Sequence, residues 1–115
     1  MASTGKTPLN PLNHDFVDEN KEYAKIVLSK NKSQKETTLR DINFKDYEQY
    51  LEKTLTETSV EIRIQIKDEW YGYGFDIPGG HKIYPDKTVV ETTEDTIKVK
   101  IFKETKFRLK DAMMS

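Results

Sequence analysis

His81 is the residue whose type and neighbours come nearest to a catalytic or metal-binding site. It follows two glycines, and Asp76 and Asp86 lie five residues to either side of it. An imidazole beside two carboxylates can transfer a proton or bind a metal ion. This spacing matches no motif with a known mechanism, however, and a histidine in a loop is more often solvated. We therefore expect no catalytic residue, no metal site and no cofactor, and we predict that the chain is not an enzyme.

Residues 3–7 (STGKT) look like the end of a phosphate-binding loop. Such a loop needs a further glycine five positions before Gly5, a buried strand ahead of it and a helix after it. The chain begins only four residues before Gly5, and prolines follow. The segment is therefore rejected as a nucleotide-binding motif.

Lysine and arginine are concentrated in residues 97–110, where six of them face only one acid, Glu104. This segment carries +5 in a chain whose net charge is −1, which leaves −6 for the remainder. Together with an exposed Trp70, such cations would suit the backbone of a single-stranded nucleic acid. Because the rest of the chain is acidic, a solvated face with lysines along a strand edge is the simpler interpretation. The nucleic-acid alternative would use Lys98, Lys100, Lys106 and Arg108.

Glycines and aromatic residues alternate between Trp70 and Phe75. On a strand, Tyr71, Tyr73 and Phe75 would share one face, and Trp70 would share the other with two glycines. The first face fits a core, whereas an exposed tryptophan beside bare backbone is typical of a binding hot spot. The predicted interface combines this second face with polar residues across from it and residues near the N-terminus: Trp70, Gly72, Gly74, Arg63, Gln65, Pro8, Leu9, Pro11 and Leu12.

The composition predicts one small domain with a modest core. Of the 115 residues, 35% are hydrophobic and 34% charged, and there is no cysteine for disulfides or thiolate metal sites. No apolar run is long enough to span a membrane, the N-terminus lacks a signal-peptide core, and Ala2 excludes myristoylation. We expect an intracellular protein, or a component of an assembled particle, without membrane contact. Residues 1–15 are predicted to be an extended N-terminal arm that reaches a neighbouring subunit, and residues 16–115 a single domain.

The clearest element is a strand over residues 59–67. Its aliphatic residues alternate with charged or polar ones, which is typical of a strand with one buried face. A turn centred on residues 68–69 would pair it with residues 70–75. This register would place the following residues opposite one another: Ile66 and Tyr71, Ile64 and Tyr73, Ile62 and Phe75, Gln65 and Gly72, Arg63 and Gly74.

A second hairpin is predicted over residues 88–93 and 96–102, with its turn at residues 94–95. Apolar residues would then oppose each other on one face and opposite charges on the other. The expected pairs are Val90 with Val99 and Glu91 with Lys98.

The remaining segments are predicted to be helices, turns and loops. Asn43 would cap a helix ending near residue 57, because apolar residues recur there at steps of three and four. Residues 16–28 fit a helix or a short strand over 24–28, and the helix is preferred. Residues 29–38 are expected to form a loop, residues 78–81 a type II turn, and residues 106–110 either a last strand or a tail.

The elements together indicate an α+β domain, in which one or two helices pack on an antiparallel sheet of four to five strands. The most consistent function is that of a non-enzymatic structural or interaction subunit of a larger assembly, for which a phage or virus particle is one setting. Its partners would be other protein subunits, including copies of itself. The alternatives are a small inhibitor that blocks a partner enzyme and a single-stranded nucleic-acid-binding protein.

Overall fold

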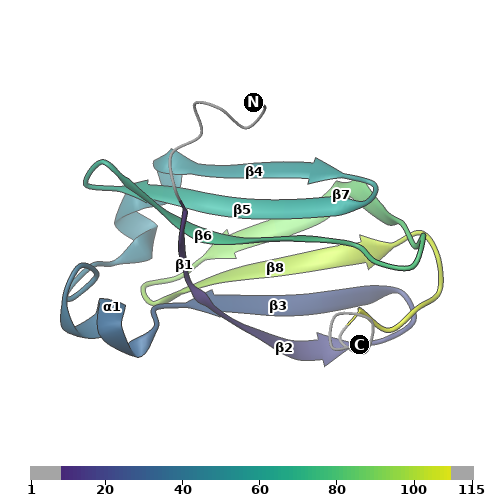
Figure 1. Ribbon diagram of the computed structural model, residues 1–115, viewed down its shortest axis with the longest axis horizontal. Helices are drawn as coiled ribbons and strands as arrows, with labels where there is room; N and C mark the ends of the chain where they lie inside the picture. Colours follow the sequence, from purple (N-terminus) through teal and green to yellow (C-terminus); the bar gives the residue numbers. More distant parts are fainter. Residues whose placement is uncertain (1–8, 110–115) are drawn as a thin grey trace.

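The computed structural model describes residues 9–109, which form two four-stranded β-sheets packed face to face (Figure 1). Neighbouring strands are antiparallel, except that β1 runs parallel to β6. Sheet A has the order β1-β6-β5-β4, with β1 Leu9–Pro11, β4 Leu51–Thr56, β5 Ser59–Ile66 and β6 Glu69–Asp76. Sheet B has the order β2-β3-β8-β7, with β2 Asn13–Glu19, β3 Tyr23–Ser29, β7 Ile83–Thr92 and β8 Thr96–Lys103.

The core lies between the two sheets and is mainly aliphatic. The alternation predicted for residues 59–67 is confirmed, because the four inward residues of β5 are at most 2% exposed. A second sheet, rather than the predicted helix, covers the inner face of sheet A, so the protein is mostly β. The inward residues of three of the four central strands are Val60, Ile62, Ile64 and Ile66 of β5, Ala24, Ile26 and Leu28 of β3, and Ile97, Val99 and Ile101 of β8.

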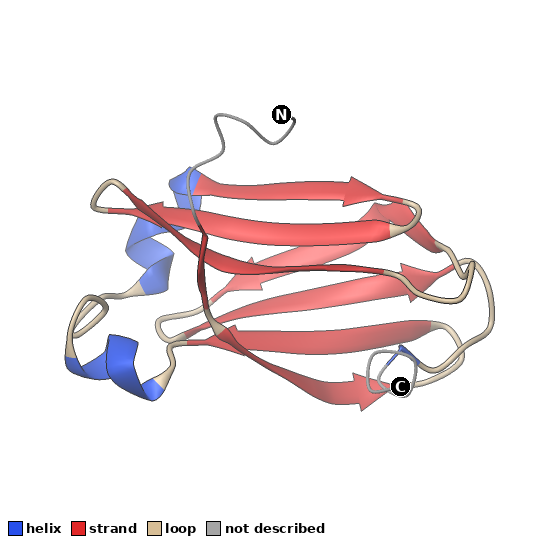
Figure 2. Cartoon of the chain, viewed as in Figure 1, coloured by secondary structure: helices blue, strands red, loops and turns tan. Residues whose placement is uncertain are grey.

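The two short helices of the described chain lie at one end of the sandwich (Figure 2). They are α1 (Lys32–Glu36), inside the predicted loop, and the 3₁₀ helix η1 (Phe44–Tyr50). Asn43 caps η1 as expected, since its side chain accepts the Lys45 N–H at 2.9 Å. The prediction of a helix to residue 57 is wrong, because β4 begins at Leu51. Leu51 and Leu55 fit the period of a strand as well as that of a helix, and their pairing with β5 decides the outcome.

The preferred helix over residues 16–28 is also wrong, and the strand alternative is confirmed. β2 and β3 form a hairpin whose turn is held by Asn20, with Oδ1 accepting the N–H groups of Glu22 and Tyr23 at 2.7 and 3.0 Å. The alternation of buried and less buried residues along β3 follows the two-residue period of a strand.

The hairpin of β5 and β6 is confirmed, with a register that differs by two residues from the prediction. Its turn is Lys67-Asp68, where φ is 51° and 70°, as a two-residue hairpin turn requires. Ile64 therefore opposes Tyr71, and Arg63 opposes Gly72. A shift of two residues keeps every side chain on its predicted face, because side chains alternate with a period of two.

The second hairpin is confirmed with both of its predicted pairs. β7 begins earlier than expected, at Ile83, and its register shifts between Tyr84 and Val89. In the connection before β7, both glycines of residues 78–81 have positive φ, 70° and 72°, which corrects the predicted type II turn because only one central residue has positive φ there. Residues 106–108 form no strand, and residue 110 lies outside the described residues.

A buried ion pair fastens the segment after β8 to the sandwich. The Lys103 ammonium, whose side chain is 0% exposed, lies 2.5 Å from the Glu19 carboxylate. It also donates to the backbone oxygens of Asn20 and Phe107, each at 2.7 Å, and Glu19 accepts the Leu109 N–H. Three acceptors satisfy the three N–H donors of the ammonium, and the Glu19 carboxylate balances its charge.

Candidate binding faces

The outer face of sheet A is organised around Arg63. Its guanidinium donates to Glu52 at 2.9 Å, lies 3.9 Å from Glu61 and sits 4.6 Å from the centre of the Trp70 ring. Trp70 is half-buried rather than the exposed aromatic that the alternation predicts. The predicted interface residues Arg63 and Trp70 are thus brought together. The Arg63 guanidinium, however, contacts the Trp70 ring and the carboxylates of Glu52 and Glu61 within the chain.

Gly72 and Gly74 sit on the same face in different surroundings. A Cβ on Gly72 would lie 2.0 Å from the Ile62 backbone oxygen, so the close approach of β5 and β6 requires glycine there. A Cβ on Gly74 would lie 3.3 Å from the Glu61 side chain and 3.4 Å from the Val60 backbone oxygen, which is ordinary or slightly tight contact. Gly72 is buried and Gly74 is exposed, so only Gly74 presents bare backbone to a partner.

The described residues of the predicted N-terminal arm lie in the two sheets of their own chain. Leu9 and Pro11 belong to β1, opposite Trp70 and Gly72, and Leu12 is 3% exposed at the point where the chain passes from sheet A to sheet B. The predicted boundary at residue 15 falls within β2. Pro8 lies outside the described residues, and contact of the arm with a neighbouring subunit stays a prediction.

The outer face of sheet B carries lysines instead of a paired arginine. Lys25 on β3 lies directly opposite Lys100 on β8, and Lys98 is two residues along the same face of β8. None of the three makes an ion pair with a carboxylate of residues 9–109. Like charges directly opposite each other on a sheet destabilise it. This arrangement therefore costs stability, and no ion pair within residues 9–109 offsets it.

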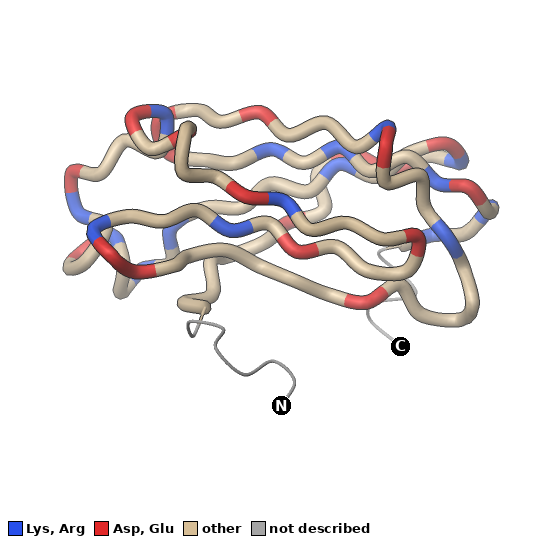
Figure 3. Tube along the Cα trace, turned by 90° about the horizontal axis from the view of Figure 1, so that it is seen from above, with Lys and Arg blue, Asp and Glu red and all other residues tan. Residues whose placement is uncertain are grey.

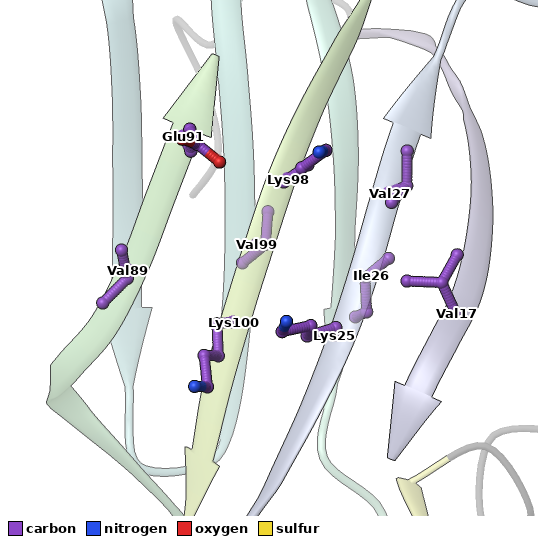
Figure 4. Close-up of a pocket in the computed structure, with 9 residues that line it drawn as sticks. All are labelled: Val17, Lys25, Ile26, Val27, Val89, Glu91, Lys98, Val99 and Lys100. Carbon is purple, nitrogen blue, oxygen red and sulfur yellow. The ribbon is translucent and has the colours of Figure 1, made fainter. Parts of the chain in front are cut away.

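These lysines line a groove of about 340 Å³ that crosses all four strands of sheet B (Figure 4). Val17 on β2 and Val89 on β7 stand at its two sides, with the lysines between them. Both valines are unusually exposed, at 57% and 54%. The groove is lined by Val17, Lys25, Ile26, Val27, Val89, Glu91, Lys98, Val99 and Lys100.

Aromatic rings adjoin the lysines on the same face. Phe102 on β8 pairs with Tyr23 on β3 and with Tyr84 on β7. The Lys100 ammonium lies 4.2 Å from the Tyr23 ring centre and 5.1 Å from that of Phe102, within the range of a cation–π contact. The Lys100 side chain thus lies over the Tyr23 and Phe102 rings, on which a nucleic-acid base would have to stack.

The structure divides the residues predicted for nucleic-acid binding. Lys98 and Lys100 lie in the groove, whereas Lys106 and Arg108 follow β8 and do not line it, and Trp70 belongs to the other sheet. Both signs of charge are interspersed along the chain (Figure 3). The sequence interpretation missed Lys25, Val17 and Val89, although the strand alternative for residues 24–28 would have placed Lys25 on an outer face.

His81 takes part in packing within the described chain. Its ring stacks on Phe107 with a centroid distance of 4.4 Å, and Nδ1 lies 3.3 Å from the Thr105 hydroxyl. It makes no ion pair with Asp76 or Asp86. Over residues 9–109, no three histidine or acidic side chains gather closely enough to hold a metal ion. The same stretch contains no helix with the length and apolar character needed to cross a membrane.

No known protein family model matches the chain, and no curated protein sequence is similar to it.

Proposed function

We propose that the protein is a non-enzymatic binding module that contacts another protein through the outer face of sheet B. The observation that carries this proposal is the opposed pair Lys25 and Lys100, neither of which forms an ion pair with a described carboxylate. An acidic partner would relieve the repulsion between the two ammonium groups and gain two charge-assisted contacts.

Exposed apolar side chains on the same face support a protein partner. Three of the four most exposed large hydrophobic residues, Val17, Tyr84 and Val89, lie on the strands of sheet B. Protein interfaces combine an apolar contact area with a few oriented charges, and this face offers both. Membership of a larger assembly is consistent with such a surface, and the particle setting remains a prediction.

Site-specific photo-crosslinking tests the proposal. A photoreactive residue at position 89 reports on sheet B, and one at position 54 reports on the outer face of sheet A. We expect the partner to be captured from position 89 in the cells that produce the protein. Affinity for the purified partner should then fall by about tenfold or more in Lys98→Glu/Lys100→Glu. A Lys32→Glu/Lys45→Glu control has the same charge change outside the groove and should bind normally. Capture from position 54 alone would place the interface on the Trp70 face instead.

The same experiment separates two kinds of protein partner. If the captured protein is an enzyme whose activity falls on binding, the inhibitor alternative applies. If it is a further copy or another structural subunit, the assembly function applies. A truncation that tests the arm should end at residue 8, since β1 and the buried Leu12 belong to the sandwich.

Single-stranded nucleic acid is the second candidate, because Lys98 and Lys100 share a face with Tyr23 and Phe102. Aromatic rings beside a basic surface are the usual means of binding single strands. Titration with a labelled oligonucleotide over a series of salt concentrations tests it. An affinity that falls steeply with salt, and that is lost in Lys98→Glu/Lys100→Glu, would support this candidate over a protein partner.

A further inference from the structure

The direction of the groove limits the shape of what can fill it. The groove runs across the strands, from Val17 on the edge strand β2 to Val89 on the edge strand β7. Three inter-strand spacings separate these edges, which gives a length of about 14 Å. An extended peptide rises about 3.3 Å per residue, so five residues span this length, and the first, third and fifth side chains face the sheet.

The positive charges of the groove lie at its centre, and negative charges lie toward its edges. Lys25 and Lys100 are opposed on the two central strands, and their Cβ atoms are expected about 5 Å apart. On the edge strands, Asp18 pairs with Lys25 in register and Glu91 pairs with Lys98. Valines and carboxylates therefore flank a compact positive centre, in which a single acidic side chain can reach two ammonium groups.

We propose that the groove binds an extended acidic segment of the partner protein, with one Asp or Glu at its centre and an apolar residue two positions to either side. The central carboxylate contacts Lys25 and Lys100, and the apolar side chains cover Val17 and Val89. This inference rests on the proposed function and specifies the sequence that the partner presents.

The carboxylates at the edges favour this occupant over a continuous polyanion. Negative charges spread evenly along a ligand would approach Asp18 at one end and Glu91 at the other, where like charges repel. A segment with its charge confined to the middle avoids both. Val17 and Val89 also gain apolar contacts that a phosphate backbone does not supply.

Two synthetic peptides of identical composition test this pattern. The first, acetyl-Gly-Leu-Ser-Glu-Ser-Leu-Gly-amide, has its acid in the centre, and the second, acetyl-Gly-Glu-Ser-Leu-Ser-Leu-Gly-amide, has it near one end. We expect the first to shift the amide NMR signals of residues 17, 25, 89 and 100 and to bind about tenfold more tightly than the second. Equal affinity of the two peptides, or shifts confined to sheet A, would overturn the inference.

Substitutions in the groove provide a second test of the proposed peptide contacts. Lys100→Glu should abolish binding of the acid-centred peptide, and Val89→Ser should weaken it by about threefold, while Lys45→Glu leaves it unchanged. Unchanged signals from sheet A in each variant show that it is folded. Binding that survives Lys100→Glu contradicts the proposed contact.

The failure of this inference can be told apart from that of the proposed function. If the crosslinked partner depends on Lys98 and Lys100 but the order of residues in the peptides makes no difference, the face binds protein without the proposed pattern. If neither peptide binds and an oligonucleotide shifts the groove signals, both are replaced by the nucleic-acid alternative.

Discussion

The outer faces of the two sheets share the same pleated backbone but differ in how their cations are paired. On sheet A, the Arg63 guanidinium contacts Glu52, Glu61 and the Trp70 ring, so one cation has three partners within the chain. On sheet B, Lys25 and Lys100 are directly opposed without a carboxylate partner among residues 9–109. Lys100 does contact the Tyr23 and Phe102 rings. A cation in an ion pair contributes to the stability of its own fold, whereas two opposed ammonium groups outside any ion pair lower stability, and an approaching anion would relieve their repulsion.

A third arrangement occurs on the inner side of β8. Lys103 lies on the same strand as Lys98 and Lys100, but it faces inward and is completely buried with three acceptors. Neighbouring lysines on one strand therefore serve different purposes according to the face that they occupy. Substitutions at these positions should consequently differ in size and in what they affect.

The largest effect is expected for Lys103→Met, which removes the buried ammonium that contacts the Glu19 carboxylate. Breaking a buried ion pair from one side costs about 3–5 kcal/mol in the free energy of unfolding. Urea denaturation followed by circular dichroism measures this loss. Lys103→Met combined with Glu19→Gln removes both charges and should recover part of the stability. A loss below about 1 kcal/mol in the single variant would show that the pair is not buried in solution.

Gly72→Ala should be the next most destabilising change, at about 3 kcal/mol, because the new methyl group would collide with the Ile62 backbone oxygen. The carbonyl cannot move without separating β5 from β6. Gly74→Ala is the matched control on the same strand. Its nearest neighbour is the flexible Glu61 side chain at 3.3 Å, and the Val60 backbone oxygen lies at an ordinary contact distance of 3.4 Å, so its effect should stay below about 1 kcal/mol. Equal effects of the two variants in thermal unfolding would contradict the register of this hairpin.

Arg63→Ala tests the paired cation of sheet A and should lower stability by about 1 kcal/mol. Its ion pairs are partly exposed and screened by solvent, and the Trp70 contact adds a modest cation–π contribution. The wavelength of maximum Trp70 fluorescence provides an independent measurement, because it should shift when the ring loses its contact with Arg63. An unchanged spectrum together with unchanged stability would mean that Arg63 does not hold Trp70.

The smallest effect on stability is expected for Lys25→Thr in sheet B. Removal of one of two opposed ammonium groups should leave the free energy of unfolding within about 0.5 kcal/mol of the original, with a tendency to increase it. The same variant should lose affinity for the acid-centred peptide. A drop in stability above about 1 kcal/mol would show that Lys25 has a structural partner, and the contrast between the two faces would disappear.

The hairpins were predictable from the sequence because their information is local. Strict alternation in residues 59–67 predicts the strand and its inward face, although the register with β6 differs by two residues. Opposite charges at Glu91 and Lys98 predict a pair that the structure contains. Residues 51–57 were assigned to a helix because apolar residues up to Leu55 recur at steps of three and four, and the spacing of four between Leu51 and Leu55 also fits a strand. Residues 16–28 fitted a helix or a strand, and the helix was preferred. Their partners, β8 for β3 and β5 for β4, are distant in sequence, and pairing with them decides the strand state.

The candidate groove was only partly predictable for the same reason. Lys98 and Lys100 were recognised because they alternate along one strand. Lys25 joins them only through the pairing of β3 with β8, and Val17 and Val89 come from the two edge strands of the sheet. Trp70 was expected to be exposed, but the Arg63 side chain lies over its ring, and alternation along a strand carries no information about such cover.

By itself, the sequence determined which residues of the two hairpins face inward, because the period of a strand sets the face of every side chain along it. It also determined that the domain would be held together without disulfides, because the chain has no cysteine. Only the tertiary structure decided that a second sheet, and not a helix, covers the first, because the strands of each sheet come from distant parts of the chain. The same long-range pairing decided which lysine forms a buried ion pair and which lysines line a groove outside any ion pair.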